Sequence, residues 1–190
     1  MNYIVALPRS GTKYITTVLN DVGVTAAHEK KISKGVEIDW KNAVCKFKPT
    51  DIILHQVRNP LDVISSLSTI SFAGHGGLIL KHVPNCKTSS LLNFMKFYYH
   101  WNEYCESKSM FTYKIEDMNS ELLEKIISLF QIKNTVHLDQ FANIPTTVNT
   151  RKTKKTYKKV TWIDLKECSE EYYNLIQDQA KKYGYTNLDN

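Results

Sequence analysis

The chain has few of the residues that hold small exported domains together. Its 190 residues include only four cysteines, which are widely spaced and form no Cys-x-x-Cys pair. They are Cys45, Cys86, Cys105 and Cys168. A disulfide framework or a zinc ribbon requires closer and more regular spacing. We therefore expect free thiols, as in a reducing compartment.

Long apolar runs are also missing. A membrane span requires roughly 18 uninterrupted apolar residues, and no stretch of this chain approaches that length. Only Met1 and Asn2 precede the first apolar segment, which leaves no room for a secretion signal. We therefore expect no membrane span and a location in the cytoplasm of the producing or host cell.

The sequence shows no regular metal-ligand pattern. His75, His82 and Cys86 fall within one short segment, but their spacing is irregular and a fourth ligand is missing. We expect no bound metal.

The turn after the first apolar segment lacks the Walker A pattern. That pattern has a lysine directly after its second glycine, followed by a Ser or Thr that binds magnesium. Here Gly11 is the only glycine of the turn, and Thr12 follows it. A magnesium-dependent nucleotide triphosphatase is therefore disfavoured.

What the turn does contain suits an anion. An apolar strand from Tyr3 to Leu7 leads into Arg9, Gly11 and a helical pattern. The apolar residues of that pattern fall at i, i+3, i+4 and i+7, at Ile15, Val18, Leu19 and Val22. Such a strand–turn–helix directs backbone N–H groups to one spot at the positive end of the helix dipole, where phosphate or sulfate binds. Gly11 lets the backbone approach the anion, and Arg9 adds a charged fork.

The net charge of +6 is unevenly distributed, because six of the 25 basic residues lie between Arg151 and Lys159. This indicates an anionic ligand near that segment. Aromatic residues are not interleaved with the basic ones, as a single-strand binder would need, so we expect no nucleic-acid partner.

Strands alternate with helices along the chain, which predicts an α/β fold. Strands are expected at 3–7, 52–57 and 110–115, with a short break or strand at 22–27. Helices are expected at 15–22, 60–70 with Asn59 as N-cap, 89–107, 118–130, from 162 onward and at 170–183. Irregular polar sequence is expected at 28–40, a mobile loop at 71–87 and a basic loop at 143–160. We predict one domain over residues 1–190, with a three-layer arrangement of a parallel sheet and helices on both faces.

Two segments together resemble a known family. The segment from Leu7 to Thr12 resembles the 5′-phosphosulfate loop of sulfotransferases. The segment from Arg58 to Ser66 resembles their 3′-phosphate motif, an Arg followed eight residues later by a Ser. Both stand at strand-to-helix junctions, in the family's order and about fifty residues apart. Weaker similarity, notably to small bacterial and phage-type members, extends over 28–29, 113–118, 149–151, 160–165 and 183–185.

The resemblance implies a P-loop-like fold and a donor, 3′-phosphoadenosine 5′-phosphosulfate. The sulfuryl group would pass to a hydroxyl or amine acceptor and leave adenosine 3′,5′-bisphosphate, without a metal. In this family Arg9 would hold the bridging and 5′-phosphate oxygens. Arg58 and Ser66 would hold the 3′-phosphate. Backbone N–H groups would come from Ser10, Gly11, Thr12 and Lys13.

Sulfuryl transfer also needs a base that takes the acceptor's proton. Glu29 is the first choice, because a glutamate lies just after the helix of the phosphosulfate loop in glycan and tyrosine sulfotransferases. His28 is the second choice, because a histidine has this role in cytosolic small-molecule enzymes, although it lies further along their chains.

Two features depart from the family pattern. Lys13 stands where members often have a second threonine, and the C-terminal Arg-Lys-Gly motif of cytosolic members is missing. We expect the basic segment that begins at Arg151 to replace that motif over the 3′-phosphate, an inference from charge alone.

Two other hypotheses stay open. A P-loop phosphotransferase such as a nucleotide kinase predicts magnesium-dependent binding of ATP. A non-enzymatic basic module predicts salt-sensitive binding of polyanions through residues 151–159. The identity of the acceptor and the oligomeric state are open, and the short chain favours an extended acceptor such as a glycan.

Overall fold

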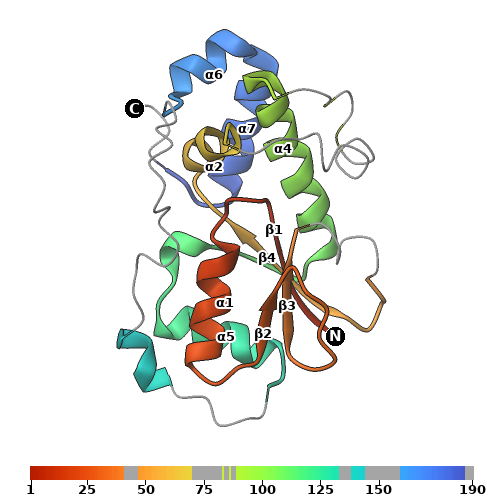
Figure 1. Cartoon of the computed structure of the whole chain (residues 1–190). Helices are drawn as coiled ribbons and strands as arrows, with labels where there is room; N and C mark the ends of the chain where they lie inside the picture. The colour runs from red at the N-terminus through yellow and green to blue at the C-terminus, as the bar shows by residue number, and fades with distance from the viewer. Residues whose placement is uncertain are drawn as a thin grey trace.

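A sheet of five parallel strands, in the order β2-β3-β1-β4-β5, forms the centre of the molecule (Figure 1). The computed structural model describes residues 1–40, 47–69, 83, 86, 89–132, 138–143 and 159–186. The strands are β1 (Asn2–Ala6), β2 (Ala26–His28), β3 (Val36–Asp39), β4 (Ile52–Val57) and β5 (Phe111–Lys114). The predicted α/β fold with a parallel sheet is confirmed.

The position of β1 determines where a ligand can bind. In register, Ile4 stands beside Ile38 of β3 on one side and Leu54 of β4 on the other. Because all strands are parallel, their carboxyl ends meet at one edge of the sheet. The turn after β1 therefore opens between the ends of β3 and β4, the usual ligand position in such sheets.

Helices cover both faces of the sheet, as predicted. They are α1 (Thr12–Asp21), α2 (Pro60–Leu67), α4 (Leu91–Lys108), α5 (Ser120–Leu129), α6 (Trp162–Cys168) and α7 (Glu170–Lys182). Two short 3₁₀ helices, η2 (Ile115–Asp117) and η3 (Leu138–Asn143), complete the regular structure of the described residues.

The alternation of side chains along β1 produces two separate cores. Tyr3, Val5 and Leu7 belong to the core formed with α2, α4, α6 and α7, while Ile4 belongs to the core formed with α1 and α5. Burial of apolar surface on both faces of one sheet is the main force that holds these three layers together.

The aromatic face of α4 lies in the first core, as its sequence predicts. Phe97, Tyr98 and Trp101 are almost completely buried, and the indole of Trp40, just after β3, packs edge-on against Phe97 and Trp101. This packing fixes the end of β3 against α4, next to the carboxyl edge of the sheet.

One sequence expectation about this region is wrong. Residues 28–40 were expected to be irregular, but the structure places β3 among them, between β1 and β2. The segment alternates Val36, Glu37, Ile38 and Asp39, and all four side chains are buried. Glu37 is accommodated because it accepts a hydrogen bond from the Ile32 N–H at 2.9 Å. Because Glu37 and Asp39 both carry carboxylates, the sequence of this buried strand resembles that of a solvated loop.

Other boundaries shift by one to three residues where capping side chains act. The second helix begins at Pro60 with Asn59 as its N-cap, as predicted, but it ends at Leu67 rather than at residue 70. The expected loop at 71–87 lies outside the described residues except for Val83 and Cys86, and the expected basic loop at 143–160 lies largely outside them.

Two further observations concern the chain as a whole. Within the described ranges, no helix is both long enough and apolar enough to cross a membrane. The described cysteines Cys86, Cys105 and Cys168 are free.

Candidate anion-binding site

The turn between β1 and α1 is wound tightly around its single glycine. Arg9 and Gly11 both adopt left-handed backbone conformations, with φ of 78° and 83°. The positive φ favours glycine at residue 11, and a Cβ there would also be crowded, at 3.2 Å from Ile115 Cγ1. Gly11 is the N-cap of α1 and provides no side-chain cap, which leaves the first-turn N–H groups available to an anion.

One of the predicted backbone donors is already used inside the turn. The Ser10 N–H donates to the carbonyl of Leu7 at 3.2 Å, and Ser10 itself is buried. Of the four predicted N–H donors, those of Gly11, Thr12 and Lys13 therefore remain the candidates.

The two sequence motifs meet in space. The Arg9 Nε donates to Ser66 Oγ at 2.9 Å, and its Nη2 donates to Thr69 Oγ1 at 3.3 Å. The Arg9 side chain thus crosses from the turn to the C-terminal end of α2. Ser66 in the last turn of α2 and Thr69, two residues past the end of that helix, form a pair of hydroxyls.

Arg58 connects the same two segments from the other side. Its Nη1 donates to the Arg9 carbonyl at 3.2 Å, and its Nη2 donates to Asp62 Oδ2 at 3.2 Å. The side chain of Arg58 is 37% exposed, so its guanidinium is accessible to a ligand. The hydroxyl of Tyr98 donates to the Arg58 carbonyl and fixes its backbone.

The start of α2 is held by a carboxylate from η2, the 3₁₀ helix that follows β5. The Asn59 side chain accepts from the Leu61 and Asp62 N–H groups, and Pro60 occupies the first helical position. The Asn59 N–H donates to Glu116 Oε1 at 2.7 Å, while Glu116 Oε2 accepts from the Tyr185 hydroxyl at 3.0 Å. These contacts orient the residue that follows Arg58.

The candidate bases lie at the end of β2, beside the turn. His28 Nε2 is 2.9 Å from Thr12 Oγ1, at the first residue of α1. Glu29 has a left-handed φ of 55°, and its Oε1 accepts from the indole Nε1 of Trp40 at 3.0 Å. His28 Nε2 and Glu29 Oε1 are 3.7 Å apart. Of the two side chains, His28 is the one that contacts the anion-binding turn.

Burial lowers the pKa of His28 below its ordinary value, and the positive charge of Lys13 adds to this. The negative charges of Glu29 and Asp39 act in the opposite direction but do not reverse the shift. His28 is therefore a neutral imidazole at neutral pH, the form that accepts a proton.

Of the basic run at 151–159, only Lys159 lies within the described residues, so Arg151 is outside them. The next residue, Val160, donates its N–H to Ser65 Oγ on α2 at 2.8 Å. The chain that follows the basic run is thus attached to the helix that carries Ser66.

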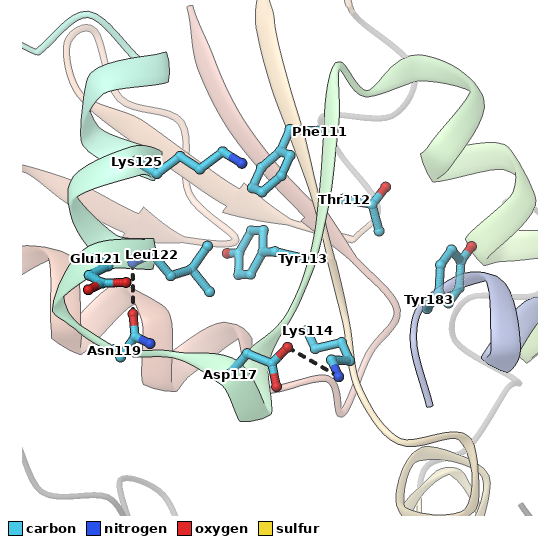
Figure 2. A pocket seen from close by; sticks show the side chains of 10 residues that line it. All are labelled: Phe111, Thr112, Tyr113, Lys114, Asp117, Asn119, Glu121, Leu122, Lys125 and Tyr183. Atoms are coloured by element: carbon cyan, nitrogen blue, oxygen red, sulfur yellow. Dashed lines mark hydrogen bonds and ion pairs between the residues drawn. The ribbon is translucent and has the colours of Figure 1, made fainter. Parts of the chain in front are cut away.

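A separate cavity of about 400 Å³ lies along the outer edge of β5. Figure 2 shows its lining, which comes from β5, the start of α5 and Tyr183. No residue of the β1–α1 turn or of α2 lines it. This cavity is therefore not part of the candidate anion-binding site.

The sequence missed two residues of the site. Thr69 follows Ser66 by three residues, so the i, i+3 spacing on a helix was an available signal. No sequence pattern near Trp40 indicated that it contacts Glu29, because this contact depends on β3, which the sequence did not predict. Within the described residues, no cluster of three or more His, Cys, Asp or Glu side chains could hold a metal ion.

Comparisons with known proteins bear on the fold. No protein-family model matches the chain, and no curated protein matches it. Among solved structures it is similar to the crystal structure of mouse sulfotransferase SULT7A1 complexed with PAP, with a TM-score of 0.52 and 14% identity. The likeness covers 95% of this chain and 84% of that chain. The chain has the sulfotransferase fold. At this level of identity, the likeness concerns the fold alone.

Proposed function

We propose that the protein is a sulfotransferase that moves a sulfuryl group from 3′-phosphoadenosine 5′-phosphosulfate to a hydroxyl or amine acceptor. The observation that carries the proposal is the contact of Arg9 with Ser66. It joins the turn that resembles a 5′-phosphosulfate loop to the helix that resembles a 3′-phosphate motif. A donor with phosphates at both ends of its ribose needs these two places side by side.

The described residues fit such a donor. The N–H groups of Gly11, Thr12 and Lys13 would surround the 5′-phosphate, with Arg9 beside them. Arg58, Ser66 and Thr69 would hold the 3′-phosphate. Each charge-assisted bond contributes about 1.5–3 kcal/mol, so a few of them account for the roughly 8 kcal/mol of micromolar binding. Arg151 remains a proposed further contact to the 3′-phosphate.

When bound, the donor supplies the sulfuryl group and a leaving group that gains negative charge. Arg9 and the backbone N–H groups of the turn stabilise that charge, because they are fixed in place before the reaction. Lys13 adds a cation at the place where many sulfotransferases have a threonine. No metal is required for this electrostatic work.

One of the two residues at the end of β2, His28 or Glu29, is proposed to take the proton from the acceptor. Glu29 is the base that sequence reasoning favours. The contacts favour His28, because its Nε2 lies at the turn while the Glu29 carboxylate binds the Trp40 indole. In this proposal His28 takes the proton, and the negative charge of Glu29 stabilises the imidazolium that forms.

The first test is calorimetric titration with adenosine 3′,5′-bisphosphate, with AMP and magnesium-ATP alongside. The proposal expects micromolar binding of the bisphosphate without metal, and much weaker binding of AMP. Magnesium-dependent binding of ATP would support a phosphotransferase instead. Binding of none of the three would leave a polyanion-binding module, and the proposed function would be wrong.

A second test concerns the chemistry. Incubation with the radiolabelled donor and a panel of glycan, phenol and amine acceptors should transfer label to one acceptor class. The short chain favours an extended acceptor such as a glycan. The adenosine 3′,5′-bisphosphate released should equal the amount of label transferred.

A further inference from the structure

Gln56 is a polar side chain near the carboxyl end of β4, next to the buried His55. It is completely buried, and both ends of its amide have partners. The Nε2 donates to the carbonyl of Ser10 in the anion-binding turn. The Oε1 accepts from the hydroxyl of Tyr113 on β5 at 2.9 Å. These three residues form a buried chain of hydrogen bonds from the sheet edge strand to the turn.

The direction of this chain matters for the anion. In a trans peptide the carbonyl and the following N–H point in opposite directions. Gln56 holds the Ser10 carbonyl toward the sheet, so the N–H of Gly11 points away from the sheet. That is the direction of the expected anion.

The neighbouring peptide is held in the same manner. Arg58, two residues beyond Gln56 and directly after the end of β4, donates to the Arg9 carbonyl. Consecutive carbonyls of the turn, those of Arg9 and Ser10, are thus fixed by two side chains from the end of β4 and the residue after it. The turn needs this help, because Arg9 and Gly11 both have left-handed backbones and Gly11 provides no cap.

Tyr113 in turn orients Gln56. An amide can rotate by half a turn and exchange its oxygen and nitrogen. The Tyr113 hydroxyl donates to the oxygen, which leaves the nitrogen facing Ser10. Burial raises the pKa of Tyr113 well above its usual value, so the hydroxyl keeps its proton and remains a donor.

We propose that Gln56, oriented by Tyr113, is a positioning residue that aligns the Gly11 N–H with the 5′-phosphate of the nucleotide. The nucleotide part of this statement rests on the proposed function. The alignment of an N–H group with an anion does not depend on which anion binds.

The test compares three variants of the full chain. Gln56→Leu removes the bond to Ser10. Tyr113→Phe keeps the ring and removes only the hydroxyl that orients Gln56. Thr112→Val is the matched control, because it removes a neighbouring β5 hydroxyl whose contact is His55 Nδ1 at 3.4 Å. Figure 2 shows Thr112 on the opposite side of β5 from Tyr113.

Affinities for AMP and for adenosine 3′,5′-bisphosphate are measured by calorimetry, and melting temperature is recorded for each variant. Gln56→Leu should weaken both ligands by the same factor, about tenfold, since both carry the 5′-phosphate. Tyr113→Phe should weaken both by about threefold, a smaller effect because Gln56 is still present. Thr112→Val should leave both affinities unchanged even if its melting temperature falls.

A second measurement follows the turn directly. Selective ¹⁵N labelling of glycine gives few backbone signals, since the chain has only seven glycines. Inorganic phosphate should shift the Gly11 amide signal in the wild type and in Thr112→Val. The shift should be much smaller in Gln56→Leu.

The two ideas fail in different ways. If the wild type binds neither nucleotide but phosphate shifts Gly11 in a Gln56-dependent way, the proposed function is wrong and the positioning role stands. If the wild type binds both nucleotides, and both Tyr113→Phe and Gln56→Leu bind them with the affinity of the wild type, the positioning role is overturned. A loss of affinity that follows melting temperature in all three variants, Thr112→Val included, would also overturn it.

Discussion

The Arg9 Nε and the Ser66 Oγ lie 2.9 Å apart although 57 residues separate them in the sequence. This bond places the cation of the turn within reach of the hydroxyl of α2. If Ser66 holds a 3′-phosphate, Arg9 has to share or release this hydroxyl when the donor binds.

Arg58→Ala should weaken adenosine 3′,5′-bisphosphate by more than about tenfold, because a charge-assisted phosphate contact is lost. AMP lacks the 3′-phosphate and should lose much less, although Arg58 also holds the Arg9 carbonyl. Calorimetry with both ligands measures the two effects. The control is Asp62→Asn, which changes the exposed partner of Arg58 but keeps its guanidinium. An equal loss of affinity for both ligands would show that Arg58 does not bind the 3′-phosphate.

Ser66→Ala should weaken the bisphosphate by about fivefold and leave AMP nearly unchanged, since a single hydroxyl bond to phosphate is removed. Ser68→Ala is the control, because Ser68 is an exposed serine on the same helix end and donates only to the Ser65 carbonyl. A bisphosphate affinity that is the same in both variants would contradict the assignment of Ser66.

The base can be assigned from pH profiles of turnover. Because burial lowers the pKa of His28, the imidazole is neutral above pH 6.5, and turnover should fall only at lower pH as the ring gains a proton. Glu29 raises this pKa, so Glu29→Gln should move the acid limb to still lower pH while retaining activity. His28→Gln should abolish transfer and leave product affinity intact.

The opposite result is equally informative. Loss of turnover in Glu29→Gln together with normal turnover in His28→Gln would assign the base to Glu29, as the sequence first suggests. Trp40→Phe, which removes the indole N–H that binds Glu29, should affect turnover only in that case.

His55 predicts how stability depends on pH. Burial lowers the pKa of this fully buried imidazole to about 4. The unfolded chain therefore binds a proton between about pH 6.5 and 4 while the folded chain does not. The free energy of unfolding is therefore unaffected by the titration of His55 above pH 6.5. It decreases as pH falls from about 6.5 to about 4, by about 3 kcal/mol in total.

Urea unfolding at pH 7.0, 5.5 and 4.5 would measure this dependence. In His55→Gln the loss should be smaller by the amount assigned to His55, and Asn102 and Thr112 provide hydrogen-bond partners for the new amide. An identical loss in His55→Gln and the wild type would show that other groups titrate instead.

The sequence was most informative where function depends on local backbone geometry. The turn from Leu7 to Thr12 combines a strand end, a glycine and a helix start within a few residues, so its shape could be predicted without the rest of the chain. The cap formed by Asn59 and Pro60 is equally local. The parallel α/β fold follows from the order of such units.

The sequence was least informative where contacts are made through space. The buried carboxylates Glu37 and Asp39 concealed β3, and with it the position of Trp40 beside Glu29. Gln56 is one of two polar residues near the end of a mostly apolar strand, and only its partners on β5 and in the turn give it a role. Buried polar groups need partners, but a sequence does not say which ones.

The two outermost strands are short, with three residues in β2 and four in β5. A sheet edge attracts other chains because it presents unpaired backbone groups in a row. With so few groups at either end, the sheet offers a poor template for a foreign strand. The short lengths of β2 and β5 thus disfavour aggregation, while the same two strands carry His28 and Tyr113.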